Sequence, residues 1–193
     1  MSKESDFYDF GPGKMIAGGD LPSYSVNVGD LESDEKGTGA RMNENKQRVE
    51  LLPVRHWAHL FWTAKHNAKD MEAHRAAFCA AVDALAVFQE GDYNAQKLLA
   101  PLWPIWFDEA VEVFVYGTHK YKMWNWLKGQ PWSVPLASAI RHAKADLIDG
   151  DLIDNESGLS HVGHFTCNLI MLAQFSTSYT EGNDFPAPEY FHD

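Results

Sequence analysis

Residues 133–175 read SVPLASAIRHAKADLIDGDLIDNESGLSHVGHFTCNLIMLAQF and contain two apolar segments separated by an acidic loop. The spacing of the apolar residues predicts one helix over residues 135–148 and a second over residues 159–175. Ser133 is expected to cap the first helix, because its hydroxyl can accept from an unpaired amide, and Gly150 is expected to end it. This part of the chain therefore predicts a pair of neighbouring helices joined by a loop.

Further apolar helices are predicted before this pair. One covers residues 107–121, and a short one covers residues 94–102, where Pro101 and Pro104 stop it. Residues 56–89 are rich in alanine and contain no proline or glycine, so they form one long helix or two. No segment has the alternation typical of a strand. The sequence predicts an all-α fold, a bundle of four to five helices.

The two ends of the chain differ in composition from the helical region. Residues 1–45 are rich in Gly, Ser, Asp and Lys without sustained periodicity, which is typical of an extended or mobile arm. Residues 46–178 are expected to form a single all-α catalytic domain, since a segment of this size can bury a core of its own. Residues 179–193 are expected to form an irregular tail.

The overall composition argues against several classes of protein. Among 193 residues, 16 are basic and 27 acidic, and the net charge of −11 argues against binding to nucleic acid. An acidic protein can still bind phosphates when metal ions supply the positive charge. Cys79 and Cys167 lie in apolar helical segments and suggest a reducing compartment. We see no signal peptide and no apolar run near the roughly 20 residues that span a bilayer, so a soluble cytoplasmic protein is expected.

Two pairs of polar residues lie at helical spacing on the predicted helices. Glu109 and Glu112 are three residues apart on one face, where they either hold a divalent ion or simply favour a helix start. His142 and Asp146 are four residues apart, a spacing that suits a metal site and is also typical of an ordinary ion pair.

The last helix and the loop before it carry the densest group of candidate ligands. His161 and His164 are three residues apart, Asn168 follows one turn later, and apolar neighbours place this stripe beside the core. A single histidine there is usually a hydrogen-bonded core residue, but two histidines with an asparagine favour a site. Residues 151–158 add three acids, among them Glu156, whose oxygens suit Mg²⁺ and are also common in helix-capping turns.

Basic and aromatic residues near these groups could bind a phosphorylated ligand. The basic candidates are Lys46, Lys120 and, beside His142 in a mainly apolar helix, Arg141. Three tryptophans could form one wall of a base pocket or a small hydrophobic cluster of their own: Trp124, Trp126 and Trp132. The chain has no phosphate loop, dinucleotide fingerprint or His-Glu-x-x-His helix, and an adjacent His-Asp pair occurs only at positions 192–193.

Three blocks of the sequence resemble the phage-associated dATP/dGTP diphosphohydrolase family, which is similar to the all-α MazG-like nucleoside triphosphate pyrophosphohydrolases. The blocks are GARMNENK at 39–46 with LLP at 51–53; YGTHKY at 116–121 with Asn125 and Trp126; and Arg141 and His142 with GDLIDNESG at 150–158, His161, His164 and Asn168. The third block is the most specific, because the order and spacing of its polar groups are unusual.

The chain departs from that family pattern in two places. Residues 54–106 separate the first two blocks where a much shorter connection is expected, so they resemble a helical insertion. The Glu-x-x-Glu and Glu-x-x-Asp metal motifs of MazG-like enzymes are not intact. His161 and His164 stand where the Glu-x-x-Asp would fall, and Asp146 falls near the second Glu of the other motif.

The resemblance implies metal-dependent hydrolysis of purine deoxynucleoside triphosphates, dATP and dGTP, to monophosphate and pyrophosphate, which would shape the nucleotide pool. The implied cofactor is Mg²⁺ or Mn²⁺, the expected assembly is a homo-oligomer, and the compartment is the host cytoplasm if the gene is carried by a phage. The assigned residues are Glu109, Glu112 and Asp146 for catalysis; Lys46, Lys120, Asn125, Trp126 and Arg141 for substrate; and Asp146, Glu156, His161, His142, His164, Glu109 and Glu112 for metal. The alternatives are a non-catalytic nucleotide- or metal-binding regulatory protein, or an interaction protein whose polar groups form a structural network.

Overall fold

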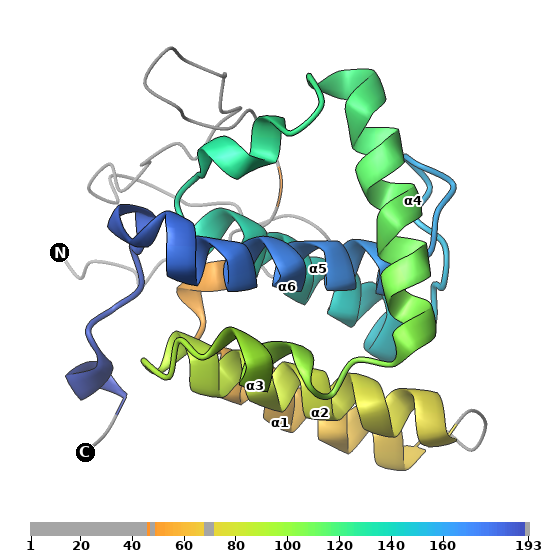
Figure 1. The fold of residues 1–193 in the computed structure, drawn as a ribbon. Helices are drawn as coiled ribbons and strands as arrows, with labels where there is room; N and C mark the ends of the chain where they lie inside the picture. Colours follow the sequence, from red (N-terminus) through yellow and green to blue (C-terminus); the bar gives the residue numbers. More distant parts are fainter. Residues whose placement is uncertain (1–45, 47–48, 68–71, 192–193) are drawn as a thin grey trace, which may run out of the picture.

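A computed structural model describes residues 46, 49–67 and 72–191 of the chain, and these residues form six α-helices (Figure 1). The arm predicted for residues 1–45, most of the first resemblance block and the His-Asp pair at 192–193 lie outside the described residues. The helices are α1 Val54–Asn67, α2 Glu72–Gln89, α3 Ala95–Leu99, α4 Pro104–Lys120, α5 Ser133–Lys144 and α6 His161–Ser178. Short 3-10 turns cover Val49–Leu51, Asn125–Lys128, Thr180–Gly182 and Pro188–Tyr190.

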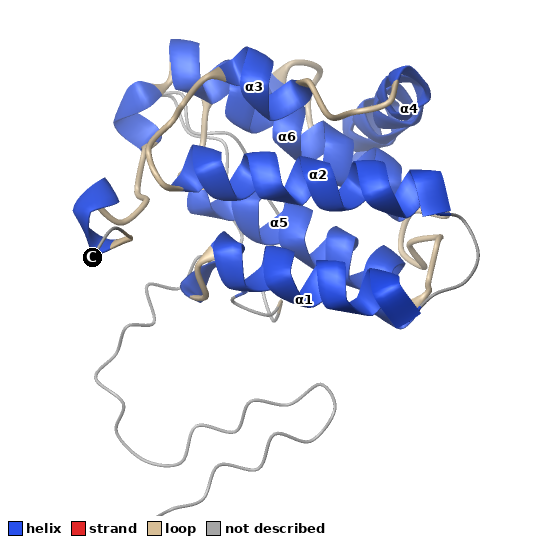
Figure 2. Ribbon diagram, turned by 90° about the horizontal axis from the view of Figure 1, so that it is seen from below, coloured by secondary structure: helices blue, strands red, loops and turns tan. Residues whose placement is uncertain are grey.

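The all-α prediction is confirmed. The described part of the chain contains no strand (Figure 2). Its one extended pairing is the isolated bridge between Ile153 and Ser160. The predicted four to five helices become six, because residues 56–89 divide into α1 and α2 and the short helix expected near residue 95 forms as α3. Helix α4 starts at Pro104, before the predicted start, and proline is favourable at the first position of a helix.

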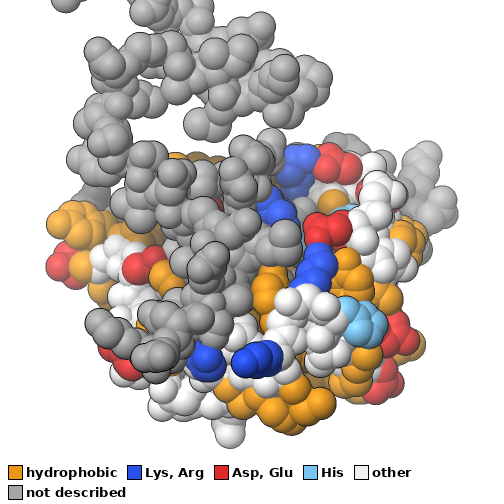
Figure 3. Space-filling model, turned by 90° about the horizontal axis from the view of Figure 1, so that it is seen from above, with side chains coloured by type: hydrophobic (Ala, Val, Ile, Leu, Met, Phe, Trp, Pro, Cys, Tyr) orange, Lys and Arg blue, Asp and Glu red, His pale blue; other side chains and the backbone are white. Residues whose placement is uncertain are grey.

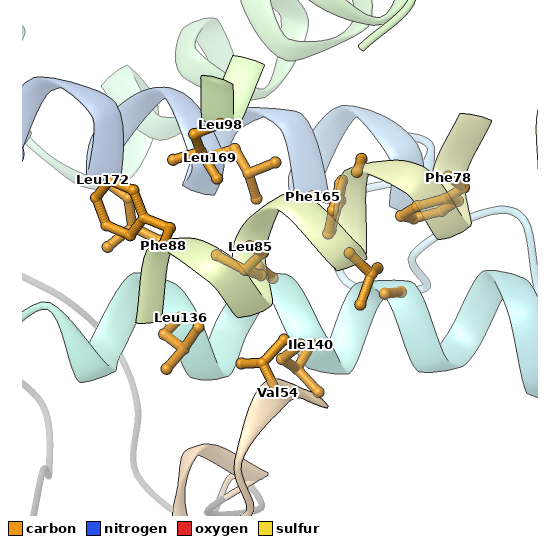
Figure 4. Close-up of a cluster of buried hydrophobic side chains, with 14 of the residues drawn as sticks. Val54, Phe78, Leu85, Phe88, Leu98, Leu136, Ile140, Phe165, Leu169 and Leu172 are labelled. Carbon is orange, nitrogen blue, oxygen red and sulfur yellow. The ribbon is translucent and has the colours of Figure 1, made fainter. Parts of the chain in front are cut away.

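Helix α6 lies at the centre of the helical bundle and packs against α3, α4 and α5. It is apolar over most of its circumference, as expected for a helix covered on several sides. Helix α2 closes the core against α5 and α6, and its Phe78 meets Phe165 of α6 with ring centroids 4.5 Å apart (Figure 4). Leu85 and Leu136 are fully buried in the same cluster. These contacts fix the directions of α5 and α6, which carry the histidines discussed below.

The start of α5 is capped by a residue far away in the sequence. The prediction that Ser133 caps this helix is wrong, because Ser133 is already the first helical residue and follows Trp132. Instead the carboxylate of Asp184 accepts from the backbone amide of Ser133 at 2.8 Å and from its hydroxyl. The C-terminal tail thus supplies the acceptor that the helix start needs.

The end of α5 widens into a π-helical turn, Ala145–Asp149. As predicted, Gly150 ends the helix: it adopts a left-handed conformation, with φ of 71°, and the amide of Asp151 bonds back to the carbonyl of Ala145 at 3.0 Å. A π turn has more residues per turn than an α-helix, so residues after Lys144 leave the face that α-helical spacing predicts.

Helices α4 and α6 approach one another at Gly163. A β-carbon built on Gly163 would lie 2.8 Å from the backbone oxygen of Glu109 in α4, closer than packed atoms tolerate. Ser160 caps α6 by accepting from the Gly163 amide at 3.0 Å, and its hydroxyl donates to the carboxylate of Glu109. The contact between the two helices therefore depends on a glycine at position 163.

The tail after α6 contains two 3-10 turns, Thr180–Gly182 and Pro188–Tyr190, and it is packed against the rest of the protein. The ring of Tyr179 lies against Gly129 and Gly182, where a β-carbon would be within 2.4 Å of ring atoms at both positions. Trp132 donates through its indole to the carbonyl of Tyr179 at 2.9 Å. The tail thereby holds the loop between α4 and α5, which forms one wall of the cavity described next.

Candidate nucleotide and metal site

A cavity of about 500 Å³ opens between the second half of α4, the loop after it, α5 and α6. One part of its wall is apolar and consists of Val111, Val113, Phe114, Val115, Met123, Trp124, Trp126, Cys167 and Met171. The other part is polar and consists of Lys46, Lys120, Lys122, Ser138, His142, Asp154, Glu156 and His164, with Tyr116, Thr118 and Tyr121 between. The side-chain amides of Asn125 and Gln130 lie among the apolar residues, beside Trp126 and Met171. Such a division suits a ligand with one flat apolar end and one charged end.

The apolar wall is held in place by aromatic contacts. The ring of Trp126 lies 5.1 Å from Phe114 at an interplanar angle of 34°, and 6.5 Å from Phe175 of α6. Trp124 is 63% exposed and has a left-handed backbone, with φ of 63°, which is uncommon for a bulky residue. Trp126 is therefore fixed by packing, whereas Trp124 stands at the surface of the cavity.

Two buried amides lie in the same wall. Asn125, a predicted substrate residue, is 7% exposed, and Gln130 is 1% exposed. The side-chain amide of Gln130 approaches the sulfur of Met171 at 3.8 Å, and its oxygen has no hydrogen-bond partner within the described ranges. Sequence reasoning missed Gln130, because a single glutamine in a Gly/Pro-containing loop carries no spacing signal.

Two lysines converge on one carboxylate at the polar end of the cavity. Lys120 donates to Oε1 of Glu156, and Nζ of Lys46 lies 3.8 Å from Oε2. Figure 3 shows basic and acidic side chains next to one another on one face of the molecule. The pKa of Glu156 lies below its ordinary value, chiefly because Lys120 donates to it and against the opposing effect of burial. Burial would lower the pKa of Lys120, but hydrogen bonds to Glu156 and Tyr116 outweigh it and raise that pKa.

Three histidines from α5 and α6 form a cluster beside these lysines. Nδ1 of His142 and Nδ1 of His161 are 2.8 Å apart, and the ring of His142 stacks on His164 with centroids 4.4 Å apart and an angle of 12°. His161 is only 6% exposed. Helical spacing predicted that His161 and His164 share a face, and packing of α5 against α6 brings His142 to them.

Asp154 joins this cluster from the loop before α6. Burial would raise the pKa of Asp154, but hydrogen bonds from the hydroxyl and amide of Ser157, with His164 and His161 nearby, lower it. The Ser157 hydroxyl lies 2.8 Å from Oδ2 of Asp154 and 2.7 Å from Nε2 of His164. Because an ionised carboxylate only accepts, Ser157 donates to Asp154, and His164 donates to Ser157 through a protonated Nε2.

The structure brings seven of the predicted site residues to the cavity wall and leaves others elsewhere. The seven are Lys46, Lys120, Asn125, Trp126, His142, Glu156 and His164, and His161 lies directly beside them. Glu109 accepts from Ser160, Glu112 is exposed, and neither lines the cavity. Arg141 is half-buried outside the cavity wall, and Asp146 is buried in the π turn, with Oδ1 3.6 Å from Nε2 of His74 in α2.

Asp154 is a candidate ligand that the assignment from sequence did not include. Single donor atoms of His142, Asp154 and His161 all lie within 4.8 Å of one another, a spacing that could hold one metal ion. Asp154 is one of three acids in residues 151–158, and the sequence alone did not distinguish it from Asp151 and Glu156. The metal and catalytic assignments stay predictions.

Comparison with known proteins finds a family match over the part of the chain that forms most of the cavity wall. The family model described as dATP/dGTP diphosphohydrolase, N-terminal, matches residues 89–185, half of the chain. These residues include α4, α5 and α6 and the whole cavity wall except Lys46. No curated protein and no solved structure matches the chain. Among the described helices, none is both long and apolar enough to cross a membrane. The family is named for a hydrolase of dATP and dGTP, and by this match the chain belongs to the dATP/dGTP diphosphohydrolase N-terminal family.

Proposed function

We propose that this chain hydrolyses purine deoxynucleoside triphosphates to the monophosphate and pyrophosphate in the cavity beside α4 and α6. The observation that carries the proposal is the division of one cavity into an aromatic part and a part with two lysines, three imidazoles and two carboxylates nearby. Its volume of about 500 Å³ lies within the range of small-molecule sites. In the reaction, a water oxygen bonds to the α-phosphorus, the bond from that phosphorus to the bridging oxygen breaks, and pyrophosphate leaves.

The phosphates are placed at the lysine end. Lys46 and Lys120 already hold an anion, because the carboxylate of Glu156 lies between them. A triphosphate carries more charge than a carboxylate and would compete with Glu156 for the same ammonium groups. Glu156 thus keeps the lysines together until substrate arrives.

The base is placed against the aromatic wall. Trp126 offers a fixed ring, and Trp124 can stack from the open side. Asn125 and Gln130 lie in the same wall, and the unpaired oxygen of Gln130 can accept from an exocyclic amino group of adenine or guanine. A buried acceptor that is satisfied only by the correct base is a strong source of specificity.

A divalent cation is part of the proposal. Asp154 would hold it, with His142 and His161 beside that carboxylate. A bound cation would neutralise charge on the phosphates and favour the attack of water. Glu109, Glu112 and Asp146 have other neighbours or lie outside the cavity wall, and the proposed site does not use them.

The test is incubation of the full chain with a panel of dNTPs and NTPs, with Mg²⁺ or Mn²⁺, followed by identification of the products. Pyrophosphate and monophosphate from dATP or dGTP are expected. Lys120→Met should raise KM for the nucleotide, whereas the matched Lys97→Met should not, because Lys97 pairs with Asp92 outside the cavity wall. Absence of turnover with every nucleotide would refute the proposal, and release of inorganic triphosphate would replace it with another chemistry.

A second candidate is a nucleotide-binding protein without catalysis. It is favoured by the placement of Glu109 and Glu112, the predicted acidic pair, outside the cavity. Binding of dATP or dGTP without any product in the same assay would support this candidate. If turnover is found, we further propose that the protein shapes the nucleotide pool in the cytoplasm and acts as a homo-oligomer, which sedimentation can test.

A further inference from the structure

One donor atom from each of His142, His161 and Asp154 lies within 4.8 Å of the other two, close enough for the three to converge on one ion. These donors come from α5, α6 and the loop between them, so the fold rather than one local motif brings them together. The two Nδ1 atoms are 2.8 Å apart. Nitrogen ligands about 2.05 Å from an ion are roughly 2.9 Å apart at a right angle and roughly 3.3 Å apart in a tetrahedron. The two Nδ1 atoms therefore need to move apart by about half an ångström at most to bind the same ion.

The neighbours of these ligands hold them in orientation. Ser157 donates its hydroxyl and its amide to Oδ2 of Asp154, at 2.8 Å and 2.9 Å. On the other side, Nε2 of His161 faces Oδ2 of Asp151 at 3.8 Å. A carboxylate behind the second nitrogen of a histidine is the usual support for a metal-binding imidazole.

The donor set decides which ion fits. Mg²⁺ takes oxygen ligands and an octahedral arrangement with several waters, whereas this cluster offers two nitrogens and one carboxylate. Imidazole suits Zn²⁺, Fe²⁺, Co²⁺ and Ni²⁺, and affinity for such sites rises from Mn²⁺ towards Cu²⁺. The expected Mg²⁺ therefore does not fit these three residues as its resident ligands.

We propose that His142, His161 and Asp154 bind one first-row transition-metal dication, of the Zn²⁺ or Co²⁺ type, in preference to Mg²⁺. Because His142 and Asp154 line the cavity, a ligand in the cavity would lie next to this ion. The contact between the ion and a nucleotide in the cavity rests on the proposed function, whereas binding of the ion by the three residues does not. Mg²⁺ would then act only as the counterion that arrives with a triphosphate.

The experiment measures metal binding by the full chain without nucleotide. Tag-free protein is treated with a chelator, dialysed and titrated with Co²⁺, whose visible absorption reports its ligands. One Co²⁺ per chain is expected, displaced by Zn²⁺ but not by a large excess of Mg²⁺. His161→Gln and Asp154→Asn should each weaken binding by at least about 100-fold, and Asp151→Asn by about tenfold, as typical for a residue behind a ligand.

The matched control is His119→Gln, since His119 is exposed on α4 and does not line the cavity. It should bind Co²⁺ as the unmodified protein does. Because His161 is buried, folding of each variant is checked by circular dichroism in chelator, and the half-buried Asp154 supplies the second variant. Any one of three results would overturn the proposal. These are binding of less than one Co²⁺ per chain, Co²⁺ binding by the folded ligand variants equal to that of the unmodified protein, and displacement of Co²⁺ by Mg²⁺ at similar concentration. Metal binding without nucleotide turnover would refute the proposed function alone.

Discussion

Replacing Gly163 by alanine tests the close contact between α4 and α6. The new β-carbon would lie 2.8 Å from the oxygen and 3.0 Å from the carbon of the Glu109 carbonyl, both rigid backbone atoms. Overpacking of this kind costs about 1–3 kcal/mol. Alanine gains about 0.5–1 kcal/mol over glycine within a helix. The difference between the two effects is a net destabilisation of about 0–2.5 kcal/mol, and we expect a value near its centre, about 1 kcal/mol.

The control is Gly117→Ala in α4, because a β-carbon there meets nothing within 4 Å. It should raise the free energy of unfolding by about 0.5–1 kcal/mol through helix propensity alone. For a domain of this size, about 1 kcal/mol corresponds to roughly 2–4 °C in Tm. Scanning calorimetry should thus show the Tm of Gly163→Ala about 2–4 °C below that of the unmodified protein and the Tm of Gly117→Ala above it. If Gly163→Ala melts at or above the temperature of the unmodified protein, the inferred backbone contact is wrong.

Three further predictions address the cap, the ion pair and the cavity. Asp184→Ala should destabilise the protein by about 0.5–2 kcal/mol, measured by urea unfolding, because α5 loses its acceptor at Ser133; no change would mean that the tail does not cap α5. Glu156→Gln should lower Tm at neutral pH. Because the folded-state pKa of Glu156 is lowered, its stabilisation is present above the ordinary carboxyl pKa and lost as pH falls through the lowered value. Because the pKa of Lys120 is raised, its side of the pair is lost only as pH rises through that raised value, so the Tm difference should shrink towards acid and again at strongly alkaline pH. A difference that grows towards acid would contradict the pairing. Gln130→Met should weaken binding of purine nucleotides by about tenfold, the effect of one lost hydrogen bond, with little effect on Tm; unchanged affinity in a titration would remove Gln130 from base recognition.

The helices were predictable because their signals are local. The apolar spacing of α6 and the glycine at position 150 belong to residues close together in sequence, and both predictions are confirmed. The cap of α5 was not predictable, since Asp184 lies 51 residues from Ser133 and only tertiary packing brings the two together. The division of residues 56–89 into two helices likewise had no proline or glycine to mark it.

The candidate site was predictable as a region but not residue by residue. His161 and His164 share a face by helical spacing, and His142 reaches them through packing of α5 on α6. Asp146 follows His142 by four residues, so it was expected on the same face of the helix. The π turn that begins at Ala145 adds residues to the turn, and Asp146 is buried beside His74 of α2 instead.

The position of Gly163 between His161 and His164 links helix packing to the chemistry of the cavity. The turn of α6 that touches α4 is the turn that carries both imidazoles, whereas Lys120 belongs to α4. The three proposed metal ligands come from α5, α6 and their loop, so a small displacement of α4 leaves them together. The same displacement moves Lys120 relative to Glu156 and the histidines. Gly163→Ala should therefore raise KM for a nucleotide at temperatures where the variant is folded, while Co²⁺ binding stays unchanged. If Gly163→Ala weakened Co²⁺ binding as well as nucleotide binding, α4 would instead be needed to hold the metal ligands in place.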